Sequence, residues 1–166
     1  MHRGREVVVV NGDLVNDFET AFESMRRCAY RAAYRLLGER ATAEDVAAEA
    51  LARAFARWSS VSDHAEPWVI TVATNLALDV GRRRATANDR QALLVDKAPD
   101  DQVERRLDLQ AALRALPRRQ REVVVLRFLG DLSEQATAEA LALDVGTVKS
   151  HTARGLSRLR TTVERV

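Results

Sequence analysis

The chain has 166 residues and a formal net charge of +2, from 26 Lys and Arg against 24 Asp and Glu. This balance is only mildly basic, so the global charge alone does not indicate a nucleic-acid partner. Cys28 is the single cysteine, which excludes an intramolecular disulfide and a cysteine-based zinc site. His2, His64 and His151 lie far apart and lack the spacing of metal ligands. We therefore expect no metal and no other cofactor.

The composition favours an all-α fold. Apolar residues make up 46% of the chain, aromatic residues only 5%, and glycine and proline are few, a mixture typical of helical proteins. No apolar run approaches the ~20 residues that a membrane-spanning helix needs. The run Val7–Val10 is too short for the core of a signal peptide. We therefore expect a soluble, cytoplasmic protein, in which the valine run has no assigned role.

Apolar residues step by three or four from Phe18 to Leu36, which predicts a first helix over 13–37. Gly38 follows as a C-cap, because glycine adopts the left-handed conformation that commonly ends helices. Cys28 falls inside this helix, where a buried and unreactive thiol is expected.

A second, alanine-rich helix is predicted over 43–58. Thr42 is a candidate N-cap for it, with Asp45 three residues later in the manner of a capping box. Residues 59–66 have no helical pattern and are expected to form a loop. Pro67 then suits the first turn of the next helix.

That third helix, which should run to about Arg84, carries one of two nucleic-acid signals. Its predicted buried stripe consists of Val69, Val72, Leu76 and Val80. Trp68, Asn75 and the triplet Arg82, Arg83 and Arg84 are left for a more exposed role. An aromatic ring, an amide and guanidinium groups can stack on unpaired bases and hold phosphates. Alternatively, the arginines favour the negative end of the helix and Trp68 belongs to the core.

The apolar periodicity is lost over 85–102, a stretch rich in Asp and Asn that includes Pro99. We interpret it as a flexible linker and a domain boundary. The chain is thus divided into a helical domain over 13–84, the linker, and a second helical domain over 103–166.

Apolar periodicity returns in the second domain. One predicted stripe consists of Leu109, Leu113 and Leu116, and the next consists of Val124, Val125, Phe128 and Leu129. Pro117 separates the two as the start of a new helix, and Gly130 is expected to end that helix.

The second nucleic-acid signal is a helix-turn-helix pattern. Ser133 is a good N-cap for a short helix and Asp144 for the helix that follows. On that second helix Val148, Leu156 and Leu159 are predicted to be buried. The opposite face carries Lys149, Ser150, His151, Thr152, Arg154 and Arg158. Such side chains suit base edges and phosphates in a DNA major groove.

Local charge supports this assignment. From residue 146 to the end there are five Lys or Arg against one Glu, whereas 131–144 has four acidic residues and no Lys or Arg. Positive charge is therefore placed on one helix rather than spread. An amphipathic terminal helix with a solvated basic face is the plainer alternative.

From about Phe18 to Arg160 the chain resembles the extracytoplasmic-function (group IV) sigma factors of bacterial RNA polymerase. Four stretches in order carry the resemblance: the acidic helix 43–50, the helix 68–84, the run 116–123 and the Gly-Thr-Val-Lys-Ser run 146–150. The abundance of Ala, and of Arg over Lys, is similar to that of proteins from GC-rich bacteria such as actinobacteria.

The resemblance implies a two-domain initiation factor with no active site, which binds core RNA polymerase and promoter DNA and is often held inactive by an anti-sigma factor. By position, Asp45 and Glu49 fall on the polymerase-binding face. Asn75 matches a position that lines a pocket for a flipped −10 base, with Trp68 and the triplet Arg82–Arg84 nearby. The residues implied for −35 recognition are Lys149, Ser150, His151, Arg154 and Arg158.

Two departures from the family pattern stand out. Ala48 replaces the usual glutamine of the core-binding motif. Ala142 replaces the common glycine of the helix-turn-helix turn, which is tolerable if its φ is not positive.

Two other classes of protein remain alternatives. A transcription regulator with a response-regulator type of output domain would also contain a helix-turn-helix, but its receiver domain needs strands that the first half does not show. An enzyme acting on nucleic acid would need paired carboxylates, a metal cluster or a phosphate-binding loop, and none stands out.

Overall fold

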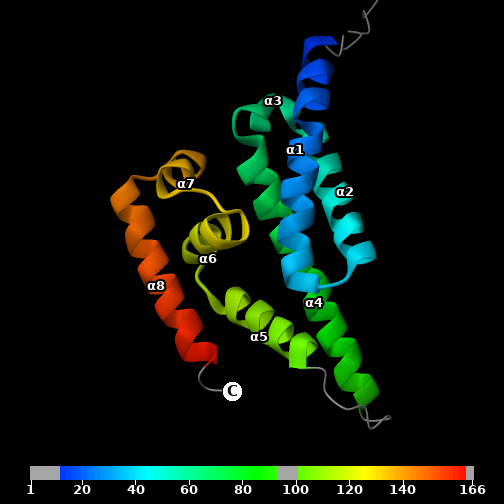
Figure 1. Cartoon of the computed structure of the whole chain (residues 1–166), viewed down its shortest axis with the longest axis vertical. Helices are drawn as coiled ribbons and strands as arrows, with labels where there is room; N and C mark the ends of the chain where they lie inside the picture. The colour runs from blue at the N-terminus through cyan, green and yellow to red at the C-terminus, as the bar shows by residue number, and fades with distance from the viewer. Residues whose placement is uncertain (1–11, 93–100, 164–166) are drawn as a thin grey trace, which may run out of the picture.

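The computed structural model describes residues 12–92 and 101–163, and every element in those ranges is helical, as predicted (Figure 1). The elements are α1 (Gly12–Leu37), α2 (Arg40–Ala56), α3 (Trp58–Val61), η1 (Ser62–His64), α4 (Ala65–Ala92), α5 (Asp101–Ala115), α6 (Arg118–Val124), η2 (Val125–Leu129), α7 (Glu134–Leu141) and α8 (Val145–Val163). The run Val7–Val10 lies outside the described residues.

The first half is built on α1, α2 and α4, which pack against one another (Figure 1). Small side chains fill much of their shared core: Ala29, Ala32, Ala33, Ala43, Ala47, Ala50, Ala54, Ala73 and Ala77 are at most 2% exposed. Because alanine methyl groups occupy many of these contacts, the helices approach closely there, and larger side chains at the alanine positions would overpack the core. The alanine-rich composition is therefore explained by helix packing.

The end of α1 is as predicted, whereas the start of α2 is not. Gly38 has a φ of +67°, the left-handed conformation expected of a C-cap. The prediction of Thr42 as an N-cap is wrong, because α2 already begins at Arg40. The Thr42 hydroxyl instead donates to Glu39 Oε2 at 2.9 Å. Nothing in the Arg-Ala-Thr sequence interrupts a helix, so α2 extends one turn further than the cap pattern indicated.

The loop predicted over 59–66 is also wrong. It consists of the short helical turns α3 and η1, and α4 begins at Ala65. Trp58 and Val61 are at most 6% exposed and anchor this segment to the core. Pro67 lies in the first turn of α4, as expected.

Helix α4 continues to Ala92 instead of ending near Arg84, which shortens the predicted linker. Residues 93–100 lie outside the described ranges. The buried face of α4 is formed by Val69, Ile70, Ala73, Ala77 and Leu78. Val72, Leu76 and Val80 from the predicted stripe are only partly buried and border this face.

The helices of the second half begin and end where the sequence predicted. Pro117 directly precedes α6, and Gly130 ends the π-helical turn η2. Ser133 Oγ accepts a hydrogen bond from the amide of Ala136 at 3.0 Å, as an N-cap does. Asp144 caps α8 in the same way, since its Oδ1 accepts from the Thr147 amide at 2.7 Å.

The buried stripe of α8 differs by one position from the prediction. Val148 is fully buried as expected, but Leu156 is 37% exposed and Gly155 takes the inward position. Helix geometry explains this: at about 100° per residue, a step of seven returns to within about 20° of the same face, and a step of eight misses it by about 80°. Gly155 therefore faces α6, while Leu156 points outward.

The two halves pack against each other. Leu113, Leu116, Val124 and Leu126 from the second half belong to the same buried cluster as the α1–α4 core. The described parts of the two predicted domains thus share a core, with α5 and η2 packed on α4 (Figure 1).

Candidate nucleic-acid interface

Helix α8 presents four of the five predicted −35 residues to solvent. Lys149, Ser150, Arg154 and Arg158 are all exposed. The last three lie four residues apart and form one row along the helix. Lys149 Nζ lies 3.8 Å from Glu134 Oε2, so α7 holds this ammonium at the start of the row. The arrangement suits insertion of α8 into a major groove.

His151 is placed differently from these four. It is half-buried, and its Nδ1 is enclosed with no hydrogen-bond partner among the described residues. One edge of the imidazole therefore faces the protein, which leaves only part of the ring for DNA. The neighbouring Thr152 hydroxyl donates to the Val148 carbonyl at 2.8 Å within the helix.

The turn that positions α8 combines a strong cap with a strained alanine. Asp144 accepts from both the amide and the hydroxyl of Thr147, at 2.7 and 2.6 Å. These bonds, the hydroxyl first, hold the pKa of the Asp144 carboxyl below its ordinary value. Ala142 has a φ of +52°, which is the left-handed conformation. The condition under which alanine would be tolerable here, a φ that is not positive, is therefore not met.

On α4, the expected −10 residues lie beside the second half of the chain. Asn75 is exposed, and with Thr71 and Thr74 it lines a cavity of about 140 Å³ whose other wall is formed by Arg118, Arg121 and Glu122. Trp68 is half-buried against the core and lines a second cavity with Asp63 and His64. The sequence did not predict that α6 faces Asn75.

The arginine triplet at 82–84 is divided in its contacts. Arg84 binds Glu39 Oε2 at 2.7 Å and the Thr42 hydroxyl at 2.6 Å, which ties α4 to the start of α2. Arg82 pairs with Asp79 at 3.7 Å. Arg83 is exposed and makes no ion pair within the described ranges. Arg84 thus has a structural contact, but the alternative interpretation of the triplet is wrong, because α4 continues to Ala92 and the three arginines do not lie at its end.

A separate face is formed by α1 and α2. Asp45 and Glu49 are exposed, and Glu49 pairs with Arg53 at 2.8 Å. Beside them runs an apolar groove of about 380 Å³, lined chiefly by Phe18, Phe22, Ala47, Ala48, Leu51 and Phe55. Phe22 and Phe55 are 40% and 53% exposed. The sequence predicted the two helices that carry these rings but not the groove between them.

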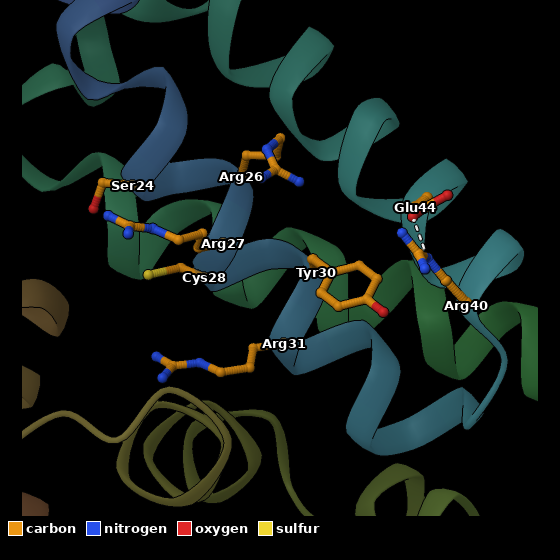
Figure 2. A pocket seen from close by; sticks show the side chains of 8 residues that line it. All are labelled: Ser24, Arg26, Arg27, Cys28, Tyr30, Arg31, Arg40 and Glu44. Atoms are coloured by element: carbon orange, nitrogen blue, oxygen red, sulfur yellow. Dashed lines mark hydrogen bonds and ion pairs between the residues drawn. The ribbon is translucent and has the colours of Figure 1, made fainter.

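Figure 2 shows a concave surface on α1 with several arginines around Cys28. Arg40 binds Glu44 at 2.9 Å, and Arg26 binds Glu23 at 2.6 Å. Burial raises the pKa of the Cys28 thiol, which keeps it protonated. The raised pKa agrees with the expected unreactive thiol, but Cys28 is only half-buried and not buried as predicted.

Two further properties concern the described residues only. Among them, His, Cys, Asp and Glu side chains nowhere gather in a group that could ligate a metal. None of the helices in these ranges combines the length and the apolarity that a membrane crossing requires.

Comparison with known proteins identifies the class. Residues 21–87 match the family Sigma-70 region 2, and residues 106–159 match Sigma-70, region 4. The first match includes most of α4, and the second includes the helix-turn-helix. The chain therefore contains both region 2 and region 4 of a sigma factor.

Individual relatives narrow the class to one family. The chain is 34% identical over 155 residues to the RNA polymerase sigma-E factor of Streptomyces avermitilis, covering 90% of this chain and 87% of that protein. It is 31% identical over 150 residues to the ECF RNA polymerase sigma factor SigW of Bacillus subtilis, covering 79% and 80%. The chain belongs to the extracytoplasmic-function sigma factors, as the sequence motifs indicated.

A solved structure agrees on the fold. The sigma factor RpoE of Bartonella quintana, crystallised with the anti-sigma factor NepR, superposes with a TM-score of 0.51 at 22% identity. The alignment covers 90% of this chain and 98% of that one. The region 2 match in the first half also favours a sigma factor over a response-regulator type of transcription regulator.

Proposed function

We propose that this sigma factor divides promoter-specific initiation among three separate surfaces. The observation that carries the proposal is their separation. The basic row on α8, the Asn75 face of α4 and the apolar groove between α1 and α2 belong to different helices and have different chemistry. In that order, the three surfaces suit duplex DNA, melted DNA and core polymerase.

The groove between α1 and α2 is the proposed docking surface for core RNA polymerase. Exposed aromatic rings such as Phe22 and Phe55 give such an interface its apolar centre, because aromatic side chains contribute most of the binding energy in many protein interfaces. Asp45 and Glu49 lie on the exposed side of α2, the helix that also carries Phe55, and supply the charged rim. Ala48 is exposed on this helix and lines the groove, so its methyl group widens the apolar part of this face.

The α4 face is the proposed site for the melted −10 element. The Asn75 amide makes no hydrogen bond within the described residues, and Thr71 and Thr74 line the same cavity. An exposed amide can read the Watson–Crick edge of an unpaired base. In this proposal Trp68 acts through its partly exposed ring, and the exposed Arg82 and Arg83 contact phosphates.

The exposed row on α8 is the proposed −35 reader. Arg154 is suited to a guanine, because a guanidinium can donate two parallel hydrogen bonds to one base edge. The protein acts as a non-enzymatic factor in the cytoplasm, where the polymerase is, and its partners include an anti-sigma factor. No cofactor takes part in this scheme.

Core binding gives the direct test. Asp45→Lys/Glu49→Lys and, separately, Phe55→Ala should weaken binding to core RNA polymerase and reduce run-off transcription, with the helical circular dichroism unchanged. The matched control is Asp101→Lys/Glu104→Lys, which reverses two exposed charges in α5, away from the groove. Unchanged polymerase affinity in both folded groove variants would overturn the assignment of this surface.

A further inference from the structure

Positive charge is concentrated on one stretch of α1. Residues 24–38 contain four arginines and no acidic residue, a local net charge of +4 in a chain whose total is +2. The stretch from residue 146 to the end, which carries the basic row of α8, has the same local excess. None of the three surfaces proposed above assigns a role to the arginines of α1.

Two of these arginines have no acidic partner. Arg27 and Arg31 lie one turn apart, are exposed, and make no ion pair within the described residues. The neighbouring Glu23 is already paired within α1 at 2.6 Å, and Glu66 of α4 accepts a hydrogen bond from the Ser24 hydroxyl. The two guanidinium charges therefore remain uncompensated.

Cys28, which lies between them, does not neutralise them. Its sulfur is hydrogen-bonded to the Arg31 guanidinium, and burial raises the pKa of the thiol, which keeps it uncharged. Figure 2 shows the side chains of Arg27, Cys28 and Arg31 on the same flank of α1. Because a guanidinium has five N–H donors, Arg31 keeps donors for a further acceptor.

Two tyrosine rings lie beside these arginines. Tyr30 and Tyr34 stack with their ring centroids 5.7 Å apart and an interplanar angle of 17°, and Tyr34 is 43% exposed. At about 100° per residue, Arg27, Tyr30, Arg31 and Tyr34 fall within an arc of about 100° around α1. We call these four residues the arginine–tyrosine face. Tyrosine and arginine are among the residue types enriched where proteins bind one another.

The arginine–tyrosine face is continuous with the apolar groove between α1 and α2. Arg27, Tyr30 and Arg31 line the concave surface of Figure 2, which has a volume of about 560 Å³. That surface and the groove share three lining residues, namely Arg26, Tyr30 and Glu44. No residue of α4 or α8, the helices proposed to meet DNA, lines either one. A protein that fills the groove is therefore placed to contact the arginines as well.

We propose that the arginine–tyrosine face binds an acidic segment of core RNA polymerase, next to the part of the polymerase that fills the groove. The proposal rests on the function proposed above for the groove. A guanidinium can donate two parallel hydrogen bonds to one carboxylate, and the exposed Tyr34 ring adds apolar contact area. The groove then has arginines on its α1 side and the carboxylates of Asp45 and Glu49 on its α2 side. Opposite charges on the two sides fix the direction in which the partner docks.

Charge reversal of the two unpaired arginines is the first test. Arg27→Glu/Arg31→Glu should weaken binding to core RNA polymerase by about ten-fold at low salt, near the lower end of measured couplings between close interfacial charges. The loss should shrink as salt is added, because the Debye length falls from about 10 Å at 0.1 M to about 3 Å at 1 M. Arg27→Gln/Arg31→Gln removes the attraction without adding repulsion and should lose less.

The matched control is Arg105→Glu/Arg160→Glu, which reverses two exposed arginines of α5 and α8 and gives the chain the same net charge. It should retain the affinity of the parent, which excludes an effect of overall charge. Circular dichroism checks that each variant keeps its helices. If the charge-reversed chain does not fold, the glutamine variant decides.

Carbodiimide coupling identifies the partner group directly. The chain has only two lysines, Lys97 and Lys149, so Arg31→Lys adds an amine that has few competitors. The reagent joins an amine to a carboxylate in contact with it. We expect a new crosslink from position 31 to an acidic residue of a core subunit, located by mass spectrometry of the digested complex. Arg105→Lys, treated in the same way, should give none.

Absence of that crosslink, or unchanged polymerase affinity of the folded glutamate and glutamine variants, would overturn the proposal. So would normal affinity for core combined with weaker binding of the assembled holoenzyme to a pre-melted promoter fragment, since the face would then contact nucleic acid. Phe55→Ala, measured in parallel, tests the groove separately. Weaker binding of Phe55→Ala alone would refute the acidic segment and leave the groove standing, whereas a loss in the arginine variants alone would refute the groove.

Discussion

Gly155 of α8 lies directly against Val124 of α6: a Cβ atom at position 155 would fall 2.7 Å from Val124 Cγ2. Real Cβ atoms do not approach other atoms so closely, and a valine has few rotamers into which it can retreat. A glycine in the middle of the recognition helix, which costs helix propensity, is thus explained by the close approach of two helices. This contact determines how α8 packs on the rest of region 4.

We therefore expect Gly155→Ala to destabilise the protein. Overpacking a core typically costs about 1–3 kcal/mol, whereas alanine gains roughly 0.8–1 kcal/mol of helix propensity over glycine. The net loss should be about 1 kcal/mol, seen as a lower urea midpoint. The same change in a Val124→Ala background should cost much less, because the clashing methyl is gone. An equal cost in both backgrounds would show that Gly155 matters for another reason.

Ala142 offers the opposite case, a stabilising substitution. Its φ of +52° strains any residue with a Cβ, by roughly 1–2 kcal/mol, and the entropy of glycine in the unfolded chain offsets about 0.4–1 kcal/mol of that. Ala142→Gly should therefore raise the free energy of unfolding by about 0.5–1 kcal/mol. Ala140→Gly, inside α7, is the control and should lower it by a similar amount. If both variants lose stability, the turn is not strained in solution.

The ends of the helices show which features of the fold can be predicted from the sequence. Caps and breaks such as Pro117, Ser133 and Asp144 were predicted correctly, because each acts on backbone groups within about four residues. Thr42 failed although it obeys the same local rule, since an extra turn of α2 was free to form ahead of it. Local chemistry indicates where a helix can start and does not exclude an earlier start.

The candidate site also contains features that the sequence predicted and features that it missed. The exposed row with Arg154 follows from the period of a single helix, so the sequence predicted it. The inward position of Gly155 was missed because the neighbouring Leu156 is apolar, and its side chain was assigned to the buried face although a step of eight turns it about 80° away from Val148. The groove at Phe55 and the position of α6 beside the Asn75 cavity depend on how separate helices pack, which no local period encodes.

The cap of α8 should titrate at acid pH. The pKa of Asp144 is lowered from its ordinary value of 3.8, chiefly by the Thr147 hydroxyl and then by its amide. A carboxyl with a depressed folded pKa stabilises the fold fully above its unfolded pKa, and that contribution is lost as the pH falls through the folded value. Asp144→Asn keeps a capping side chain but cannot titrate. The stability difference between parent and variant should thus be constant near neutrality and shrink below about pH 4. Urea titrations at several pH values measure it, and a difference independent of pH would contradict the role of the carboxylate.

Asn75→Ala should separate DNA melting from folding. Because Asn75 is exposed, its truncation should change the free energy of unfolding by no more than about 0.5 kcal/mol. Open-complex formation by the holoenzyme, followed by permanganate reactivity of unpaired thymines, should be impaired. Thr86→Ala, on an exposed part of the same helix, should behave like the parent. A large loss of stability with normal promoter opening would make Asn75 a structural residue.

Recognition of the −35 element should distinguish two neighbouring cations on α8. Lys149 is already paired with Glu134 at 3.8 Å and lies at the start of the helix, where an ammonium holds phosphate as a point charge. Arg154 is exposed one turn further on and makes no ion pair within the described residues, which leaves its guanidinium available for a base edge. The two groups should therefore contribute to affinity and to specificity in different proportions.

Arg154→Ala is expected to cost about 1–3 kcal/mol on the cognate −35 site and to relax the preference at one base pair. Lys149→Ala should weaken all sequences alike and reduce the salt slope by roughly one, because it removes one phosphate contact. Arg160→Ala removes an equal charge from another side of α8 and should leave sequence preference intact. Binding titrations on single-base −35 variants at two salt concentrations resolve these effects. Identical, sequence-independent losses for Arg154→Ala and Lys149→Ala would mean that the basic row only positions the protein and that other side chains read the bases.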